Sequence, residues 1–494
     1  MSGTVISTPP APSRLSTALA ADRVGAFGIG LSIGSSVAPL TVVAMVITTA
    51  LALTGQPGIA IGIAAVGVVL LVFAQGYLAM ARRITNAGAF YAYAAKGLGR
   101  PVGVGVSWVA LLIYPGFQIG CYGGVGAIGA PYLQDWTGIG VPWWIVAFAC
   151  WLVVAVLGAL EIGFSEKVLA VLVITETLLV LVYSIAIVTT PGFHFSLHPL
   201  AVDNLWGPGA ALAIGIGFTA FAGLEQAAAY AEEAKDARRN VARATYATIG
   251  VVGLIYVFGA TVIYSAAGEQ VYQRAGDEGT DLFFNLAAVQ LGPWAVEVGR
   301  ALILTSLLAA MIAFHNLISR YGYALGREGV APRIFGRTEG KAPRYASFAQ
   351  SAVGFAVIGL YIWFDWKPLE QLFYWGVTAG GLGVLVLLVV VSISVISYFA
   401  RDRRGENLWR RLIAPIIATL ALLALTYATF RNLPELFGVD GWTGPARVVP
   451  AALGVVFAAG VCWGLVLRAR KPEVYAKIGL GPDSVTVRAA GATR

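Results

Sequence analysis

Two glutamates lie inside apolar stretches, at a depth where a carboxylate could bind a proton, a sodium ion or a basic substrate. Glu225 follows an apolar run that ends at Phe218, and Glu176 lies nine residues after Lys167 within another. A carboxylate inside a membrane span is costly and normally faces a partner, a bundle interior or a watery cavity. Desolvation favours a neutral carboxyl group, which suits proton coupling, whereas a nearby cation keeps it ionised. Structural alternatives are a pore-edge position for Glu176 and capping of a broken helix for Glu225.

The backbone around Glu225 carries signals for a broken helix. Gly217 and Gly223 lie on the same segment, and glycine lowers helix propensity. We therefore predict a break within residues 221–223.

A second break is predicted in the first apolar segment, at residues 28–39. Glycines and serines cluster there, and Pro39 removes a backbone donor. The non-helical stretch is expected near Gly34 and Ser36, although small residues also permit close helix packing in membranes. The two segments open alike, with Gly-Ile-Gly-Leu-Ser at 28–32 and Gly-Ile-Gly-Phe-Thr at 215–219.

The elements that carry these segments are predicted to be membrane-spanning helices. The chain has 494 residues, of which 58% are hydrophobic and 12% charged, and its apolar runs are long enough to cross about 30 Å of hydrocarbon. We predict an all-α polytopic membrane protein with twelve spans. The spans are placed at residues 24–52, 59–82, 102–132, 141–160, 167–190, 209–231, 244–267, 293–325, 346–364, 369–400, 408–431 and 446–467.

Basic loops alternate with acidic ones and predict the orientation. Arg82, Arg83 and the arginines of 320–344 and 401–411 fall on one side, whereas the acidic segment 269–281 falls on the other. By the positive-inside rule both termini are expected in the cytoplasm, with tails at 1–23 and 470–494. These loops also account for the net charge of +8, so no nucleic-acid partner is expected.

The five spans between the two glycine-rich segments give them opposite orientations. Paired broken helices in halves of inverted topology indicate a secondary-transporter site near the midplane. The amino ends of such half-helices suit an anion, and freed carbonyls suit a cation. The chain contains no Walker loop, zinc motif or nucleophile elbow, so neither an enzyme nor a cofactor is expected.

Five motifs in this order resemble the amino acid, polyamine and organocation transporter superfamily, specifically bacterial amino-acid permeases. The motifs span residues 29–36, 87–93, 221–225, 231–240 and 320–332. The resemblance covers residues 24–345 and implies a LeuT-like five-plus-five inverted repeat, with halves at 24–190 and 209–400. A loop at 191–208 would separate the halves, and two peripheral helices would follow within 401–469.

The resemblance also implies a substrate site between the first and sixth spans. Backbone amides near Gly34, Ser35 and Ser36 would hold a carboxylate, and carbonyls on the facing segments would receive an ammonium group. The implied substrate-binding residues are Ser32, Ile33, Gly34, Ser35, Ser36, Thr219, Ala220, Phe221, Ala222 and Gly223.

Two residues depart from the family pattern. Ser36 adds a side chain where the family commonly has glycine, and Glu176 stands where many relatives have a lysine at the sodium position. Glu176 and Glu225, the two carboxylates inside apolar spans, are the predicted ion-coupling residues.

A charge-rich segment at 232–239 is predicted either to be a solvated turn or to close an inner gate. The predicted gate residues are Arg82, Glu232, Glu233, Arg238 and Arg320. His315 is expected to be a packed, hydrogen-bonded histidine rather than a proton relay.

The implied function is secondary active transport of a small molecule, an amino acid or related amine, across the cell membrane. Coupling to protons or sodium and exchange are open alternatives, as is a polyamine, organic-cation or nucleobase substrate. A channel or a transporter-like sensor is the alternative from another class. The sequence carries no signal for a particular oligomeric state.

Overall fold

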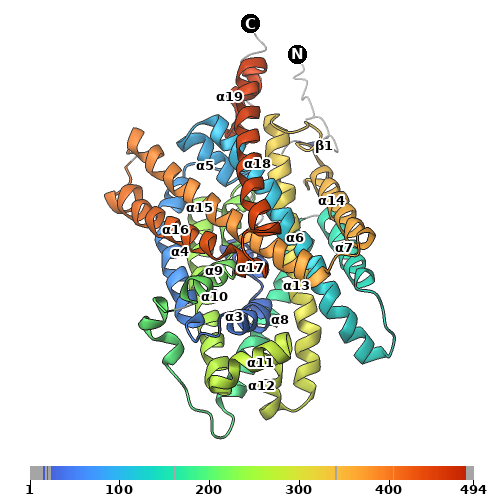
Figure 1. Cartoon of the computed structure of the whole chain (residues 1–494). Helices are drawn as coiled ribbons and strands as arrows, with labels where there is room; N and C mark the ends of the chain where they lie inside the picture. Colours follow the sequence, from blue (N-terminus) through green and yellow to red (C-terminus); the bar gives the residue numbers. More distant parts are fainter. Residues whose placement is uncertain are drawn as a thin grey trace, which may run out of the picture.

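The computed structural model describes residues 15–16, 19, 24–160, 162–207, 209–339, 342–403 and 405–484, and these are almost entirely helical (Figure 1). Eleven helices among them are long and apolar enough to cross a membrane. The predicted polytopic helical class is therefore confirmed. The count of twelve is not, because the fourth predicted span is the 17-residue helix α7 (Trp143–Ala159). Most of the predicted N-terminal tail and residues 485–494 of the predicted C-terminal tail lie outside the described residues.

The helical elements follow the order of the predicted spans. Those in the first half are α1 (Ala26–Val37), α2 (Pro39–Thr41), η1 (Val42–Val46), α3 (Ile47–Thr54), α4 (Ile59–Ala81), α5 (Phe90–Gly97), α6 (Arg100–Thr137), α7 and α8 (Ile162–Val188). Those of the central part are η2 (His198–Leu200), η3 (Val202–Leu205), α9 (Ala210–Thr219), η4 (Leu224–Tyr230), α10 (Ala237–Ala267), η5 (Gly268–Gln270), α11 (Val271–Glu278), η6 (Gly279–Asp281), α12 (Leu282–Leu291) and α13 (Trp294–Glu328). The remaining ones are α14 (Arg344–Trp363), η7 (Pro368–Tyr374), α15 (Trp375–Arg401), η8 (Trp409–Ile413), α16 (Ala414–Arg431), α17 (Leu433–Phe437), α18 (Gly444–Arg470), α19 (Pro472–Lys477) and η9 (Gly481–Ser484).

The helices pack around the two interrupted spans. Helix α1 contacts α8, α10, α13 and η4, and α9 packs against α4. The most apolar windows of the first and eighth spans are each 72% buried, whereas that of α18 is 17% buried. The last span therefore lies at the periphery, as expected. Strands β1 (Leu15–Ser16) and β2 (Thr338–Glu339) pair antiparallel at the α19 end of the molecule, opposite α11 and α12 (Figure 1).

The first break lies later than predicted. Helix α1 continues through Val37, and the interruption falls on Ala38, which has a left-handed conformation with φ 42°. The expected stretch near Gly34 and Ser36 is helical instead. The reason is Pro39, which lacks an N–H and disfavours the α conformation in the residue before it. Gly34 allows close packing, because a Cβ there would lie 3.2 Å from Val173.

The second break falls within the predicted residues. Helix α9 ends at Thr219, residues 220–223 form a turn, and the 3₁₀ helix η4 begins at Leu224. Gly223 has φ 109°, a value that favours glycine. The two breaks meet, because Ser36 Oγ donates a hydrogen bond to the Gly223 carbonyl over 3.3 Å.

Candidate functional site

The predicted substrate-binding residues lie together where the two breaks meet. Those of the first span occupy the last turns of α1, and those of the sixth occupy the end of α9 and the turn after it. All are buried except Thr219, which is half-buried. The amides of Gly34 and Ser36 lie inside α1, where helical amides bond to carbonyls one turn earlier. They do not form the free cradle expected for a carboxylate.

Glu225 lies at the start of η4 and is 6% exposed. Its Oε2 accepts a hydrogen bond of 2.9 Å from the Gly223 amide, so its side chain caps the half-helix after the second break. Its Oε1 has no hydrogen-bond partner among the described residues. Tyr114 and Tyr321 interact with the carboxylate, but neither hydroxyl forms a hydrogen bond of normal geometry.

Several buried polar groups around Glu225 were not predicted from the sequence. Tyr77 Oη donates to the Glu225 carbonyl over 3.0 Å and accepts from the Ala228 amide over 3.2 Å. Other unpredicted polar atoms have no partner within the described part of the chain: those of Tyr93, Tyr114, Gln226, Tyr230 and Tyr321; the hydroxyl of the predicted Ser32 has none either. Tyr93, Tyr114 and Tyr321 come from helices far apart in the sequence. Only Gln226 and Tyr230 lie close to Glu225 in the sequence and could have been singled out from it.

The space beside Glu225 is small. A cavity of about 20 Å³ is bounded by Tyr77, Phe218, Phe221 and Glu225, among other residues. A volume of this size holds about one water molecule. The site is therefore closed in this conformation, and a substrate requires the two broken spans to separate.

Glu176 faces the other break. It lies on α8, is 1% exposed, and interacts with the Leu40 amide and the Ser306 hydroxyl. Neither carboxylate oxygen makes a hydrogen bond of normal geometry to the described residues. Ser306 Oγ accepts from the Thr41 amide over 3.3 Å and from Thr41 Oγ1 over 2.9 Å. Glu176 thus lies at the amino end of the half-helix that begins at Pro39.

Two buried ion pairs lie beside this region. Arg320 Nε and Nη2 donate to the two carboxylate oxygens of Glu233 over 2.9 and 3.1 Å, and both side chains are at most 3% exposed. The Arg320 guanidinium also lies 4.2 Å from the centre of the Tyr230 ring. Arg327 Nη1 and Nη2 donate to Glu232 over 2.7 and 2.6 Å, and the sequence did not single out Arg327.

The other two predicted gate residues lie elsewhere. Arg82 pairs with Glu406 over 3.9 Å, and its neighbour Arg83 contacts the same carboxylate over 2.7 Å. Arg238 is exposed and forms no ion pair with the described residues. Helix packing therefore directs Arg82 to the loop before α16 and leaves Arg238 at the surface.

His315 belongs to a separate buried network. Its Nε2 lies 2.7 Å from Ser347 Oγ, and its Nδ1 lies 3.2 Å from Gln118 Nε2. Gln350 Nε2 donates to Gln118 Oε1 over 2.9 Å. Both ring nitrogens thus have partners, in a network that joins α6, α13 and α14.

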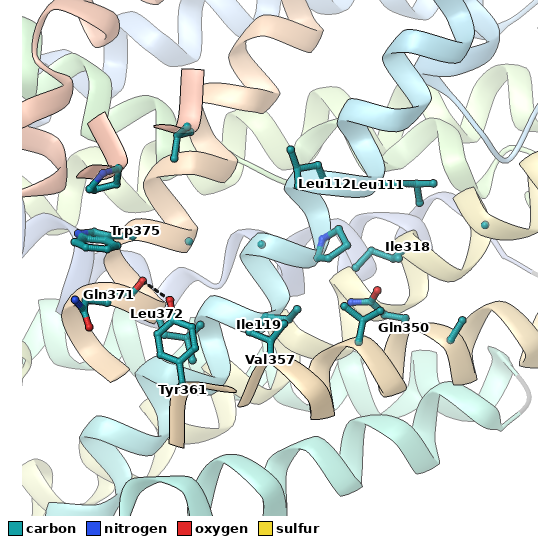
Figure 2. Close-up of a pocket in the computed structure, with 18 of the residues that line it drawn as sticks. Leu111, Leu112, Ile119, Ile318, Gln350, Val357, Tyr361, Gln371, Leu372 and Trp375 are labelled. Carbon is teal, nitrogen blue, oxygen red and sulfur yellow. Dashed lines mark hydrogen bonds between the residues drawn. The ribbon is translucent and has the colours of Figure 1, made fainter. Parts of the chain in front are cut away.

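A large cavity lies away from the buried carboxylates. It has a volume of about 870 Å³ and lies between α6, α13, α14, α15 and the peripheral α18. Figure 2 shows its mainly apolar lining, with Gln350, Gln371 and Tyr361 as polar exceptions. Because its wall is apolar and includes the exposed α18, this groove suits lipid better than a polar solute.

Comparison with known proteins confirms the family resemblance. Residues 17–457 match a family model described as amino acid permease. The chain is 26% identical over 413 residues to the low-affinity putrescine importer of Escherichia coli (strain K12), covering 80% of this chain and 84% of that protein. It is 21% identical over 424 residues to the gamma-aminobutyric acid permease of the same strain, covering 84% and 85%. A branched-chain amino acid permease of Lactococcus lactis subsp. cremoris (strain MG1363) is 23% identical over 260 residues, covering 51% of each chain.

Proposed function

Because the chain belongs to the amino acid permease family, we propose that it carries an amino acid or a related amine across the cell membrane by alternating access. The observation that carries this proposal is the meeting of two broken spans beside a buried carboxylate, at Ser36, Gly223 and Glu225. Broken helices in the middle of a membrane protein are tolerated where they line a binding site or a cavity.

The Arg320 and Glu233 pair is proposed as the inner gate. A bidentate pair in a buried setting has two discrete states, made and broken, and separation leaves both charges costly to bury. Such a contact suits a step in which the site opens to one side only. The pair of Arg327 and Glu232 lies beside it and would open with it.

Glu176 and Glu225 are proposed as the coupling residues, with a proton or sodium as the coupling ion. Each carboxylate has at least one oxygen without a hydrogen-bond partner among the described residues. We assign residues 24–190 and 209–400 to the two halves of the repeat, because each contains one of the interrupted spans. Both termini are assigned to the cytoplasm from the basic loops.

Uptake into proteoliposomes tests the function. Purified protein is reconstituted, and labelled amino acids and amines are offered with no gradient, with a proton gradient and with a sodium gradient. Saturable uptake at turnover rates that depends on a gradient or on internal substrate is expected. Continuous ohmic current would indicate a channel, and the absence of flux for every amino acid and amine would refute transport.

A further inference from the structure

Both half-helices that begin at the breaks already face a carboxylate of the protein itself. Glu225 Oε2 accepts from the Gly223 amide at the start of η4. Glu176 interacts with the Leu40 amide at the start of the half-helix after Pro39, and the next amide, that of Thr41, donates to Ser306 Oγ. The amino end of a helix is where an anion binds. Here the chain supplies that anion at both breaks.

The other backbone donors and the charged donors near the breaks are also engaged. The amides of Gly34 and Ser36 lie within α1. Arg320 and Arg327, the two arginines that close the site, are each bound bidentately by a glutamate. A substrate carboxylate that used the half-helix amino ends or these arginines would therefore have to displace a protein carboxylate. The buried donors that remain without partners among the described residues, such as Gln226 Nε2 and the Ser32 hydroxyl, are neutral.

Three of the groups that lack partners together suit a cation. Glu225 Oε1 is a carboxyl oxygen without a hydrogen-bond partner, and the hydroxyls of Tyr114 and Tyr321 make no hydrogen bond of normal geometry to the described residues. The centres of these two rings are 5.7 Å apart, and both rings interact with the Glu225 carboxylate. An ammonium group forms charge-assisted hydrogen bonds to a carboxylate and is attracted to aromatic faces.

We propose that the substrate is an organic ammonium ion held by Glu225, Tyr114 and Tyr321, and that no substrate carboxylate is needed for recognition. This inference rests on the proposed transport function and narrows its substrate class. A bound ammonium neutralises the buried charge of Glu225, which has no ion-pair partner among the described residues. A carboxylate on the substrate would bring a second negative charge into the same enclosed space, where like charges repel strongly.

Uptake of a matched pair of compounds tests the substrate class. Putrescine and ornithine share the same diamine chain, and ornithine adds one carboxylate. Norvaline keeps the carboxylate and lacks the terminal amine. We expect saturable uptake of putrescine by proteoliposomes at a kcat/KM at least tenfold above those of ornithine and norvaline. A smaller preference or a reversed one overturns the inference while leaving transport established. If the protein transports none of these three compounds and no other amine or amino acid, transport itself is overturned.

Substitution of Glu225 tests the assignment of the site. Glu225→Gln keeps an oxygen that can accept from the Gly223 amide and removes the charge, so the helix cap is retained. We expect bound putrescine to raise the Tm of the parent protein. Glu225→Gln should reduce putrescine uptake at least tenfold and abolish this rise in Tm, whereas Glu225→Asp should recover part of both. Glu370→Gln, at an exposed surface glutamate, is the matched control and should leave uptake unchanged. Putrescine uptake by Glu225→Gln within twofold of the parent overturns the assignment.

The tyrosines provide a second set of variants in case Glu225→Gln is not recovered folded. Tyr114→Phe keeps the ring and loses the hydroxyl, whereas Tyr114→Leu loses both. Putrescine uptake should fall less with phenylalanine than with leucine, and the KM should change more than kcat because the ring contacts the bound cation. Equal uptake by the parent and the leucine variant overturns the proposed cation contact.

Discussion

Glu176 and Glu225 were both predicted as buried carboxylates, but their surroundings divide their roles. Glu225 is surrounded by tyrosines from distant helices, beside the contact between the two breaks. Glu176 faces the start of the first half-helix, with Ser306 and Leu40 as its polar neighbours. We therefore propose that Glu225 contacts the substrate in addition to its part in coupling, and that Glu176 serves the coupling ion alone. These different surroundings make the two assignments separable by experiment.

Glu176→Gln should remove the ion dependence of transport. The amide has the size of the carboxyl group but can neither release a proton nor attract sodium strongly, so uptake should respond less than twofold to an imposed gradient. Exchange of internal for external substrate should persist, because the substrate contacts are unchanged. Uptake is measured at fixed substrate over a series of pH values and sodium concentrations. Transport that keeps the ion response of the parent would assign Glu176 to a structural role.

Glu233→Gln should destabilise the protein and weaken the proposed inner gate. Removal of one partner of a buried ion pair leaves an uncompensated charge, at a cost of about 3–5 kcal/mol. The loss of unfolding free energy should be near the lower end of this range, because Glu166 also interacts with Arg320 and would partly compensate its charge. Thermal unfolding in detergent measures the loss, and Glu370→Gln, from an exposed pair with Lys367, should change stability by less than about 1 kcal/mol. A Glu233→Gln protein as stable as that control would contradict the buried pairing.

At the scale of elements, the two breaks differ in origin. The first follows from Pro39 and places Ala38 at φ 42°, which is strained for a residue with a Cβ. The second uses Gly223 at φ 109° and brings the turn against Ser36. The two interrupted spans therefore meet through one serine and one glycine.

Gly223→Ala should disrupt the contact between the breaks. The backbone conformation costs about 1–3 kcal/mol for alanine, and the new Cβ would lie 2.5 Å from Ser36 Oγ. Transport should fall at least tenfold and the Tm should drop. Adding Ser36→Gly should recover only part of the loss, since it relieves the clash but not the backbone strain. Gly250→Ala on α10 is the control, because a Cβ there has no neighbour within 4 Å; equal activity of Gly223→Ala and this control would refute the tight contact.

At the scale of the whole molecule, the helices arrange charge in two ways. Loop arginines such as Arg83 and Arg403 lie toward the ends of helices, whereas Arg320 is paired inside the bundle. The loop arginines predict the orientation by the positive-inside rule, and the buried arginine is the one proposed for the inner gate. Peripheral α18 contributes to the large apolar groove and not to the region around Glu225.

Cysteine labelling tests the predicted orientation. Arg403 and Asp440 are exposed and separated by the single crossing of α16. An impermeant thiol reagent should label Asp440→Cys in intact cells and Arg403→Cys only after permeabilisation. The parent, with free Cys121, Cys150 and Cys462, provides the background signal. Labelling of Arg403→Cys but not Asp440→Cys in intact cells would show that the topology is the inverse of the predicted one.

The sequence by itself determined the helical membrane class and the second break, because both follow from local properties. Apolar run length predicts a span whatever its neighbours are, and Gly223 lies within the turn that interrupts the sixth span. The five motifs were sufficient to indicate the family. The first break was missed by a few residues, because proline acts on the residue before it and Gly34 is held in the helix by packing against Val173.

Only the tertiary structure decided which groups meet. The side chains around Glu225 come from α4, α6 and α13, and their contact depends on how these helices pack against η4. The same dependence explains why Glu233 pairs with Arg320 and not with the other predicted gate arginines, and why Glu176 faces the half-helix that begins at Pro39. Contacts between residues far apart in the chain depend on helix rotation and register, and local sequence does not encode either.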